Sequence, residues 1–195
     1  MSAPGATPKQ SLFEELRDYY EQIENIKEDV VELTAPLNDA QFNWRPAPSR
    51  WSISECLAHL NVADGLDVPL ISKEIDQARS AGLTGQGPFK YGRIGRMIIR
   101  FTEPPVKLRT PAPKIYVPPA GEPKDKVVPE FLSIHDRILE LIAKSNGLHL
   151  ARIKVPTPIP RLKFSLGQRF ALLTAHDRRH LHQAWDVRKH PDFPT

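Results

Sequence analysis

Apolar residues recur at helical spacing in four long stretches of the chain. The stretches are residues 11–33, 52–71, 127–146 and 165–188, and each repeats near the 3.6-residue period of an amphipathic helix. In the first stretch the stripe consists of Leu12, Leu16, Tyr19, Tyr20, Ile23, Ile26, Val30 and Leu33. In the second it runs through Cys56, Leu60, Ala63 and Leu66 toward Ile71, with a kink expected at Pro69. The pattern therefore predicts four long helices.

Three of these stretches begin with a capping-box pattern. A hydroxyl side chain is followed three residues later by Glu or Gln, so that each of the two can bond the other's backbone N–H. The three pairs are Ser11–Glu14, Ser52–Glu55 and Ser165–Gln168. We expect the first, second and fourth helices to start at these serines.

A proline-rich connection separates the second predicted helix from the third. It covers roughly residues 81–126, and eleven of the 20 prolines of the chain lie between Pro104 and Pro160. Residues 91–101 fit a short amphipathic helix, whereas 114–117 and 151–155 alternate as short extended segments do. A connection of this length allows the second and third helices to run parallel. We expect an all-α fold: one domain over 1–195, built as a four-helix bundle with a long crossover.

Composition narrows the class of protein. The single cysteine, Cys56, excludes an internal disulfide framework and fits a reducing compartment. Residues 1–10 lack the apolar core of a signal peptide, and no apolar run approaches the roughly 20 residues that span a bilayer. We expect a cytoplasmic protein without a membrane span.

Charge is unevenly distributed along the chain. Residues 11–32 hold eight acidic side chains, and residues 86–114 hold seven basic ones. An acidic face that meets a basic loop, within one chain or across a homodimer, explains this division. The alternative is an anionic surface as partner, bound through Lys90, Arg93, Arg96 and Arg100. No aromatic stacking platform accompanies the charge, which argues against nucleic acid.

Three histidines carry the strongest chemical signal. His176 and His180 stand four residues apart in HDRRHLHQAW, which places both imidazoles on one helical face. His59, in WSISECLAHL, lies on the apolar face of another predicted helix and can complete a three-histidine metal site. Neutral imidazoles suit one divalent ion such as Zn, Ni or Fe. The alternative is that these are hydrogen-bonded core or flanking histidines without a metal.

Three further side chains are weaker catalytic candidates. Glu55 faces the same way as His59 and could orient it or act as a base, although the capping box accounts for Glu55 without any function. His135 shares a face with apolar residues of the third predicted helix, from where it could serve as acid/base or fourth ligand. Gln183 follows His180 by one turn and could bond a ring nitrogen, or simply lie at the surface.

Two residues exclude or weaken other chemistries. Asp177 stands where the H-E-x-x-H motif of metallopeptidases needs Glu as general base, which argues against a peptidase. Asp177 could instead support the metal site or pair with Arg178 or Arg179. Cys56 could be a thiol nucleophile, but a small buried side chain is the better interpretation because nothing near it in sequence lowers its pKa.

The stretches NWRPAPSRWSISECLAHL and HDRRHLHQAW, about 115 residues apart, resemble the DinB-like family of metalloenzymes. The resemblance implies a four-helix bundle with a long crossover, often dimeric, that holds a divalent metal on His59, His176 and His180. It also implies an activity, because family members include transferases and isomerases that use low-molecular-weight thiols.

These observations lead to three hypotheses. The first is metal-dependent group transfer or isomerisation of a small-molecule substrate with a low-molecular-weight thiol. The second is a metal-dependent hydrolase that uses metal-bound hydroxide. The third is a non-enzymatic, stress-related binding bundle.

Overall fold

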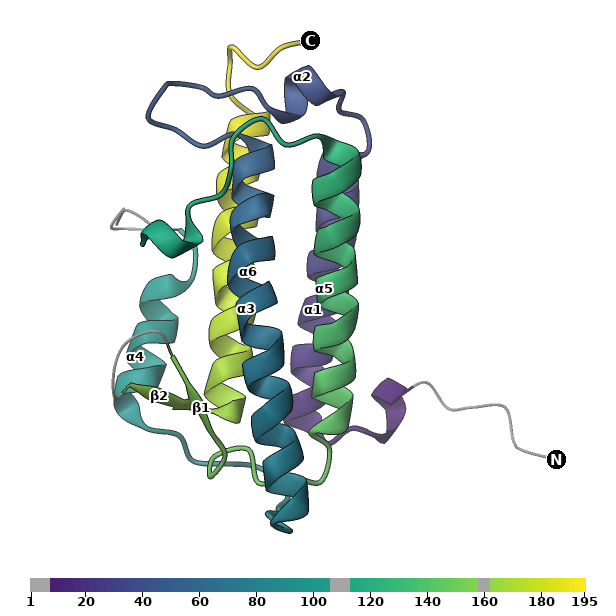
Figure 1. The fold of residues 1–195 in the computed structure, drawn as a ribbon, viewed down its shortest axis with the longest axis vertical. Helices are drawn as coiled ribbons and strands as arrows, with labels where there is room; N and C mark the ends of the chain where they lie inside the picture. Colours follow the sequence, from purple (N-terminus) through teal and green to yellow (C-terminus); the bar gives the residue numbers. More distant parts are fainter. Residues whose placement is uncertain (1–7, 106–112, 158–161) are drawn as a thin grey trace, which may run out of the picture.

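Four long helices lie side by side and make up most of the structure, a computed structural model that describes residues 8–105, 113–157 and 162–195 (Figure 1). They are α1 (Glu14–Thr34), α3 (Ile53–Ser80), α5 (Lys124–Lys144) and α6 (Leu166–Arg188). The colours of Figure 1 show that α3 and α5 run in one direction and that α1 and α6 run in the other. The mostly helical fold agrees with the all-α prediction.

The remaining elements are short. They are the 3₁₀ helices η1 (Pro8–Ser11) and η2 (Lys114–Tyr116), the helices α2 (Asp39–Phe42) and α4 (Arg93–Thr102), and the strands β1 (Lys154–Pro156) and β2 (Lys163–Ser165). The two strands form a small antiparallel sheet in which Val155 pairs with Phe164. Helix α4 confirms the amphipathic helix expected near residues 91–101. The extended segment expected at 114–117 was wrong, because η2 occupies it; the one expected at 151–155 is a strand only from Lys154.

The apolar faces of the long helices meet in one core. Helix α3 packs on α5 and α6, and α1 packs on the same two helices. Leu16, Ile23 and Val30 of α1 are fully buried, as the helical stripe predicted. Burying such a side chain contributes about 1.5–3 kcal/mol, so this core stabilises the helices that carry the functional side chains.

The start of α3 is fixed by the predicted capping box. The hydroxyl oxygen of Ser52 accepts a hydrogen bond from the backbone N–H of Glu55 at 3.1 Å, and the backbone N–H of Ser52 donates to the Glu55 carboxylate at 3.0 Å. Both residues are buried. The first turn of α3, which leads to His59, is therefore held from both sides.

The other two capping boxes were wrong. Helix α1 begins only at Glu14, with Phe13 as its N-terminal cap and no side-chain bond to the helix. Helix α6 does begin after Ser165, but the Ser165 hydroxyl donates to the side-chain oxygen of Gln168 at 3.0 Å, so it does not cap the backbone. The residue types of the capping-box motif therefore do not determine whether the serine hydroxyl bonds the helix backbone or another side chain.

Helix α3 extends beyond the apolar stripe that runs toward Ile71. It continues through Pro69 to Ser80, which agrees with the connection expected from about residue 81. Leu66, expected on the buried face, is 43% exposed, whereas Asp64 is only 2% exposed. The buried face of α3 therefore contains a carboxylate that the stripe of apolar residues did not reveal.

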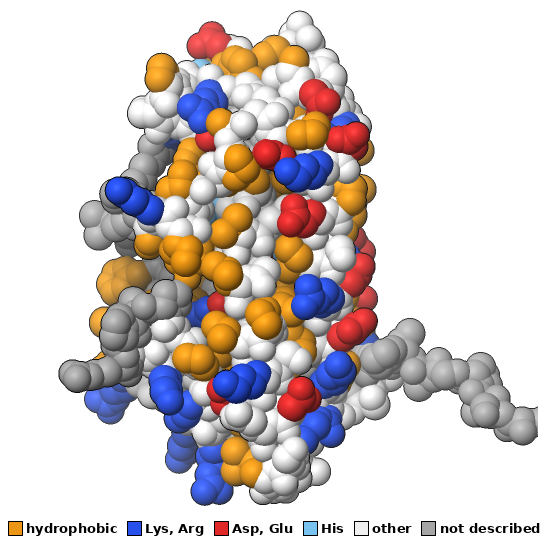
Figure 2. Space-filling model, viewed as in Figure 1, with side chains coloured by type: hydrophobic (Ala, Val, Ile, Leu, Met, Phe, Trp, Pro, Cys, Tyr) orange, Lys and Arg blue, Asp and Glu red, His pale blue; other side chains and the backbone are white. Residues whose placement is uncertain are grey.

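The connection from α3 to α5 carries α4 and η2, and its residues 106–112 lie outside the described part of the chain. Helix α4 packs on α6 and leaves Ile94, Met97 and Phe101 exposed. Basic side chains gather in the same region, at the lower left of Figure 2. Binding of an anionic surface there stays a prediction. Within the described ranges, no helix combines the length and apolar character needed to cross a membrane.

Candidate metal centre

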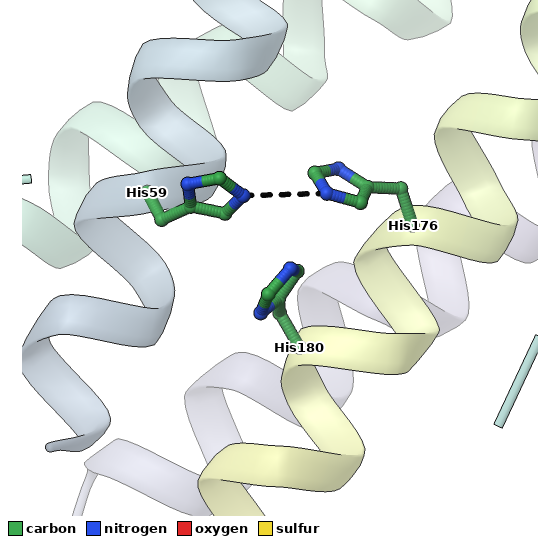
Figure 3. Close-up of side chains that lie close together, drawn as sticks. All are labelled: His59, His176 and His180. Carbon is green, nitrogen blue, oxygen red and sulfur yellow. Dashed lines mark hydrogen bonds between the residues drawn. The ribbon is translucent and has the colours of Figure 1, made fainter. Parts of the chain in front are cut away.

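The structure brings His59, His176 and His180 together, although 117 residues separate the first two in sequence. His59 projects from α3, and the other two project from successive turns of α6 (Figure 3). One nitrogen from each ring lies within 4.8 Å of the others, and the Nε2 atoms of His59 and His176 are 3.3 Å apart. Three rings from two helices thus point at one small volume.

A main-chain carbonyl sets the proton position on His59. Its Nδ1 atom lies 2.7 Å from the backbone oxygen of Tyr116 in η2. Because a carbonyl oxygen only accepts hydrogen bonds, Nδ1 must carry the proton and donate it. The Nε2 atom, which faces the other histidines, is then left with a free lone pair, as a metal ligand requires.

Burial keeps these imidazoles neutral. Loss of solvent, together with the repulsion from the neighbouring histidines, lowers the pKa of His176 to about 3 and that of His180 to about 2. Burial also lowers the pKa of His59. Nδ1 of His180 is buried without a hydrogen-bond partner among the described residues. Neutral, partly unsatisfied nitrogens are the donors that a divalent cation takes up.

Trp51, just before α3, packs against two of the three histidines. Its ring centroid is 5.0 Å from that of His59, and it stacks on His180 at 5.7 Å with 30° between the planes. The indole restricts the rotation of both rings and reduces their access to water.

A cavity of about 910 Å³ opens beside the histidines, and all three line it. Arg169 and Arg179 of α6 also line it, together with Asp67 of α3. Arg169 forms an ion pair with Asp67, and burial lowers the pKa of Arg179. The volume suits a small molecule, and arginines and aspartates line the wall in equal number, so the cavity presents charges of both signs.

The family model of the DinB superfamily matches residues 22–184, which include all three histidines and the helices that carry them. The chain belongs to the DinB superfamily. Neither the curated proteins nor the solved structures contain a match. The family membership agrees with the resemblance seen in the sequence motifs.

In this DinB superfamily chain, His135 does not join the three histidines. It belongs to a second group on α3, α5 and α6, with Asp64 and Asp177 as the other members. Its Nε2 atom lies 3.2 Å from Oδ2 of Asp177. Burial raises the pKa of both carboxyl groups, and their mutual repulsion adds to the shift of Asp64. Asp177 is thus a core residue and not the edge ion pair with Arg178 or Arg179 that the sequence suggested.

The other candidates take different places. Both carboxylate oxygens of Glu55 are used in the cap of α3 and in an ion pair with Arg45, so the capping interpretation holds. Gln183 lines the cavity and bonds His180, which raises the pKa of that ring against the effect of burial. Cys56 is fully buried, and burial raises the pKa of its thiol. It is therefore no nucleophile.

Sequence reasoning missed Asp64, Arg169 and Tyr116. A signal for Asp64 exists, because it stands on the buried side of a helix between Leu60 and Val68, where an unpaired charge is costly. Arg169 lies on the buried face of α6 in the same way. Tyr116 acts through its main-chain oxygen, which no residue pattern reveals.

Proposed function

We propose that this DinB superfamily protein is a metal-dependent enzyme in which His59, His176 and His180 bind one divalent ion. The convergence of three neutral imidazoles at the wall of a cavity supports this most directly. Metal binding is also a known property of the superfamily. We further propose the finer architecture of a four-helix bundle with a long crossover, in which the crossover supplies η2 to the site.

The residues present fit a divalent ion. Three nitrogens suit Zn, Ni or Fe, and three protein ligands leave positions open for a small molecule. The Tyr116 carbonyl orients His59, as hydrogen-bonded groups around metal ligands do. When bound, such an ion supplies Lewis acidity and lowers the pKa of a thiol or water that it contacts.

The chain's own residues define what can react there. Cys56 is the single cysteine, and it is buried in the core, so thiol chemistry needs a thiol from outside. Arg169 and Arg179 can bind the carboxylates that small cellular thiols carry. We propose group transfer or isomerisation with a low-molecular-weight thiol. In transfer, the sulfur forms a bond to the electrophilic carbon, the leaving group departs with its electron pair, and the thiol proton passes to solvent.

Metal content tests the first part of the proposal. Elemental analysis of untagged protein should give a metal at the three-histidine site, and His180→Ala should lose it. The matched control is His190→Ala, which changes a histidine near the end of the chain that contacts Trp44 and lies outside the cavity lining. Equal metal content in the wild type and His180→Ala would contradict the assignment.

Turnover tests the second part. Metal-loaded protein is assayed with a panel of electrophiles, with and without small thiols, and again after chelation. Turnover that needs both metal and thiol supports the proposal. Metal-dependent turnover without thiol identifies a hydrolase instead. No turnover in any arm, with stoichiometric metal, favours a binding bundle over an enzyme.

A further inference from the structure

The second polar group lies between helices α3, α5 and α6 and shares no residue with the three-histidine group. Asp64 is on α3, His135 on α5 and Asp177 on α6, with exposed fractions of 2%, 0% and 0%. One donor atom from each lies within 4.8 Å of the others. Nε2 of His135 is 3.2 Å from Oδ2 of Asp177 and 3.9 Å from Oδ2 of Asp64.

The hydrogen bonds of His135 decide which atom faces the carboxylates. Nδ1 of His135 lies 2.9 Å from the backbone oxygen of Phe131, so Nδ1 carries a proton and donates it. In the neutral ring, Nε2 is then a lone pair directed at two carboxylate groups. Three acceptors converge, and they need protons or a cation between them.

The surrounding described residues do not supply a donor or cation to all of these acceptor atoms. Oδ2 of Asp64 and Oδ1 of Asp177 are buried without a hydrogen-bond partner among the described residues. The cations that act on the group from outside are paired elsewhere: Lys27 with Asp136, and Arg178 with Glu103. A buried pair of carboxyl groups without a counterion is unfavourable in its charged form, so the pair must hold protons or bind a cation.

We propose that Asp64, His135 and Asp177 form a second site for a divalent cation, separate from the three-histidine site. Two carboxylates and one neutral imidazole carry a formal charge of −2, which one divalent ion balances. Mixed oxygen and nitrogen donors suit Mn, Fe or Zn. All three ligands sit on helices, which hold donor atoms more precisely than loops do.

The site has a route of entry. Asp64 lines the same cavity as His59, so an ion can reach it from the cavity. Asp177 directly follows His176, and successive residues of a helix point about 100° apart. One turn of α6 therefore supplies a ligand to each site in a different direction.

The test is metal stoichiometry in the full-length untagged chain, stripped with a chelator and reloaded with Mn²⁺ or Zn²⁺ alone. Native mass spectrometry should find two ions per chain in the wild type and one each in His180→Ala and Asp64→Asn. The double variant should hold none. Asp67→Asn removes a neighbouring half-buried carboxylate of α3 that belongs to neither ligand group, and it serves as the control that keeps both ions.

Each outcome separates this inference from the proposed function. One ion in the wild type that is lost in His180→Ala but kept in Asp64→Asn overturns the second site and leaves the first. One ion that is kept in His180→Ala but lost in Asp64→Asn overturns the three-histidine site and supports the second site. If Asp64→Asn does not fold, His180→Ala decides: a single wild-type ion at saturating Mn²⁺ and Zn²⁺ that is lost in His180→Ala overturns the proposal, whereas an ion that stays in His180→Ala supports it.

Discussion

Arg45 holds Glu55 in a two-pronged ion pair at the start of α3. Nε of Arg45 donates to one carboxylate oxygen at 2.7 Å, and Nη2 donates to the other. The first of these oxygens also accepts the backbone N–H of Ser52. Both carboxylate oxygens of Glu55 are thus engaged in holding the start of α3, which argues against a role as a base on a substrate.

Substituting this glutamate should therefore weaken the fold and leave metal binding intact. We expect Glu55→Gln to lower the free energy of unfolding by about 1–2 kcal/mol, because the helix cap and the ion pair are weakened together. Chemical denaturation measures this. The control is Glu14→Gln, an exposed glutamate in the first turn of α1, which should change stability by less than about 0.5 kcal/mol. Loss of metal from Glu55→Gln would contradict this prediction and show that Glu55 contributes to the metal site.

Metal binding should stabilise the folded protein. A ligand that binds only the folded state adds about 2.7 kcal/mol at a concentration one hundred times its Kd. We expect the melting temperature of the chelator-treated wild type to rise with added Zn²⁺. The same titration of a variant with both His176→Ala and Asp64→Asn should be flat, and a parallel rise in that variant would place the metal elsewhere.

The indole of Trp51 should report on the three-histidine site. It stacks on His180 and contacts His59, so a paramagnetic ion such as Ni²⁺ bound there should quench its fluorescence. Trp51→Phe should abolish most of the quenching and weaken metal affinity about tenfold, as expected for a group that supports metal ligands. Trp185→Phe, which removes an indole bonded to Asp29 on α1, should keep the quenching. Equal quenching in both variants would contradict the placement.

Cys56 should be inert in the folded protein over a wide pH range. Burial raises the pKa of the Cys56 thiol. At a given pH, a smaller fraction of Cys56 is therefore thiolate than for an exposed cysteine, whose pKa is about 8.5. Reaction with Ellman's reagent should therefore stay slow from pH 7 to pH 10 in the native protein. It should become fast, with the usual pH dependence, in guanidinium chloride. Rapid native labelling would show that the thiol is accessible.

Helical periodicity predicted the positions of the long helices, because burial of an apolar face determines them. The i, i+4 spacing likewise placed His176 and His180 on one face of α6. Contacts between distant segments could not be predicted from the pattern: the position of Asp64 between Leu60 and Val68 indicates burial, but it does not show that residues of α5 and α6 enclose the carboxylate. Ser165 is a second example: the capping-box motif predicted a hydrogen bond with the backbone N–H of Gln168, whereas the hydroxyl donates to the side chain of Gln168. Local rules state what a residue can do, and tertiary packing selects among those options.

The hydrogen bond that orients His59 ends on a main-chain oxygen, which every amino acid at position 116 provides. Replacing the tyrosine side chain therefore leaves the imidazole aligned, whereas inserting or deleting a residue within 113–117 moves the carbonyl away. We therefore expect the length of this stretch to matter more for the orientation of His59 than its composition does. Homologues can thus diverge there in sequence and still hold the same ring in the same orientation.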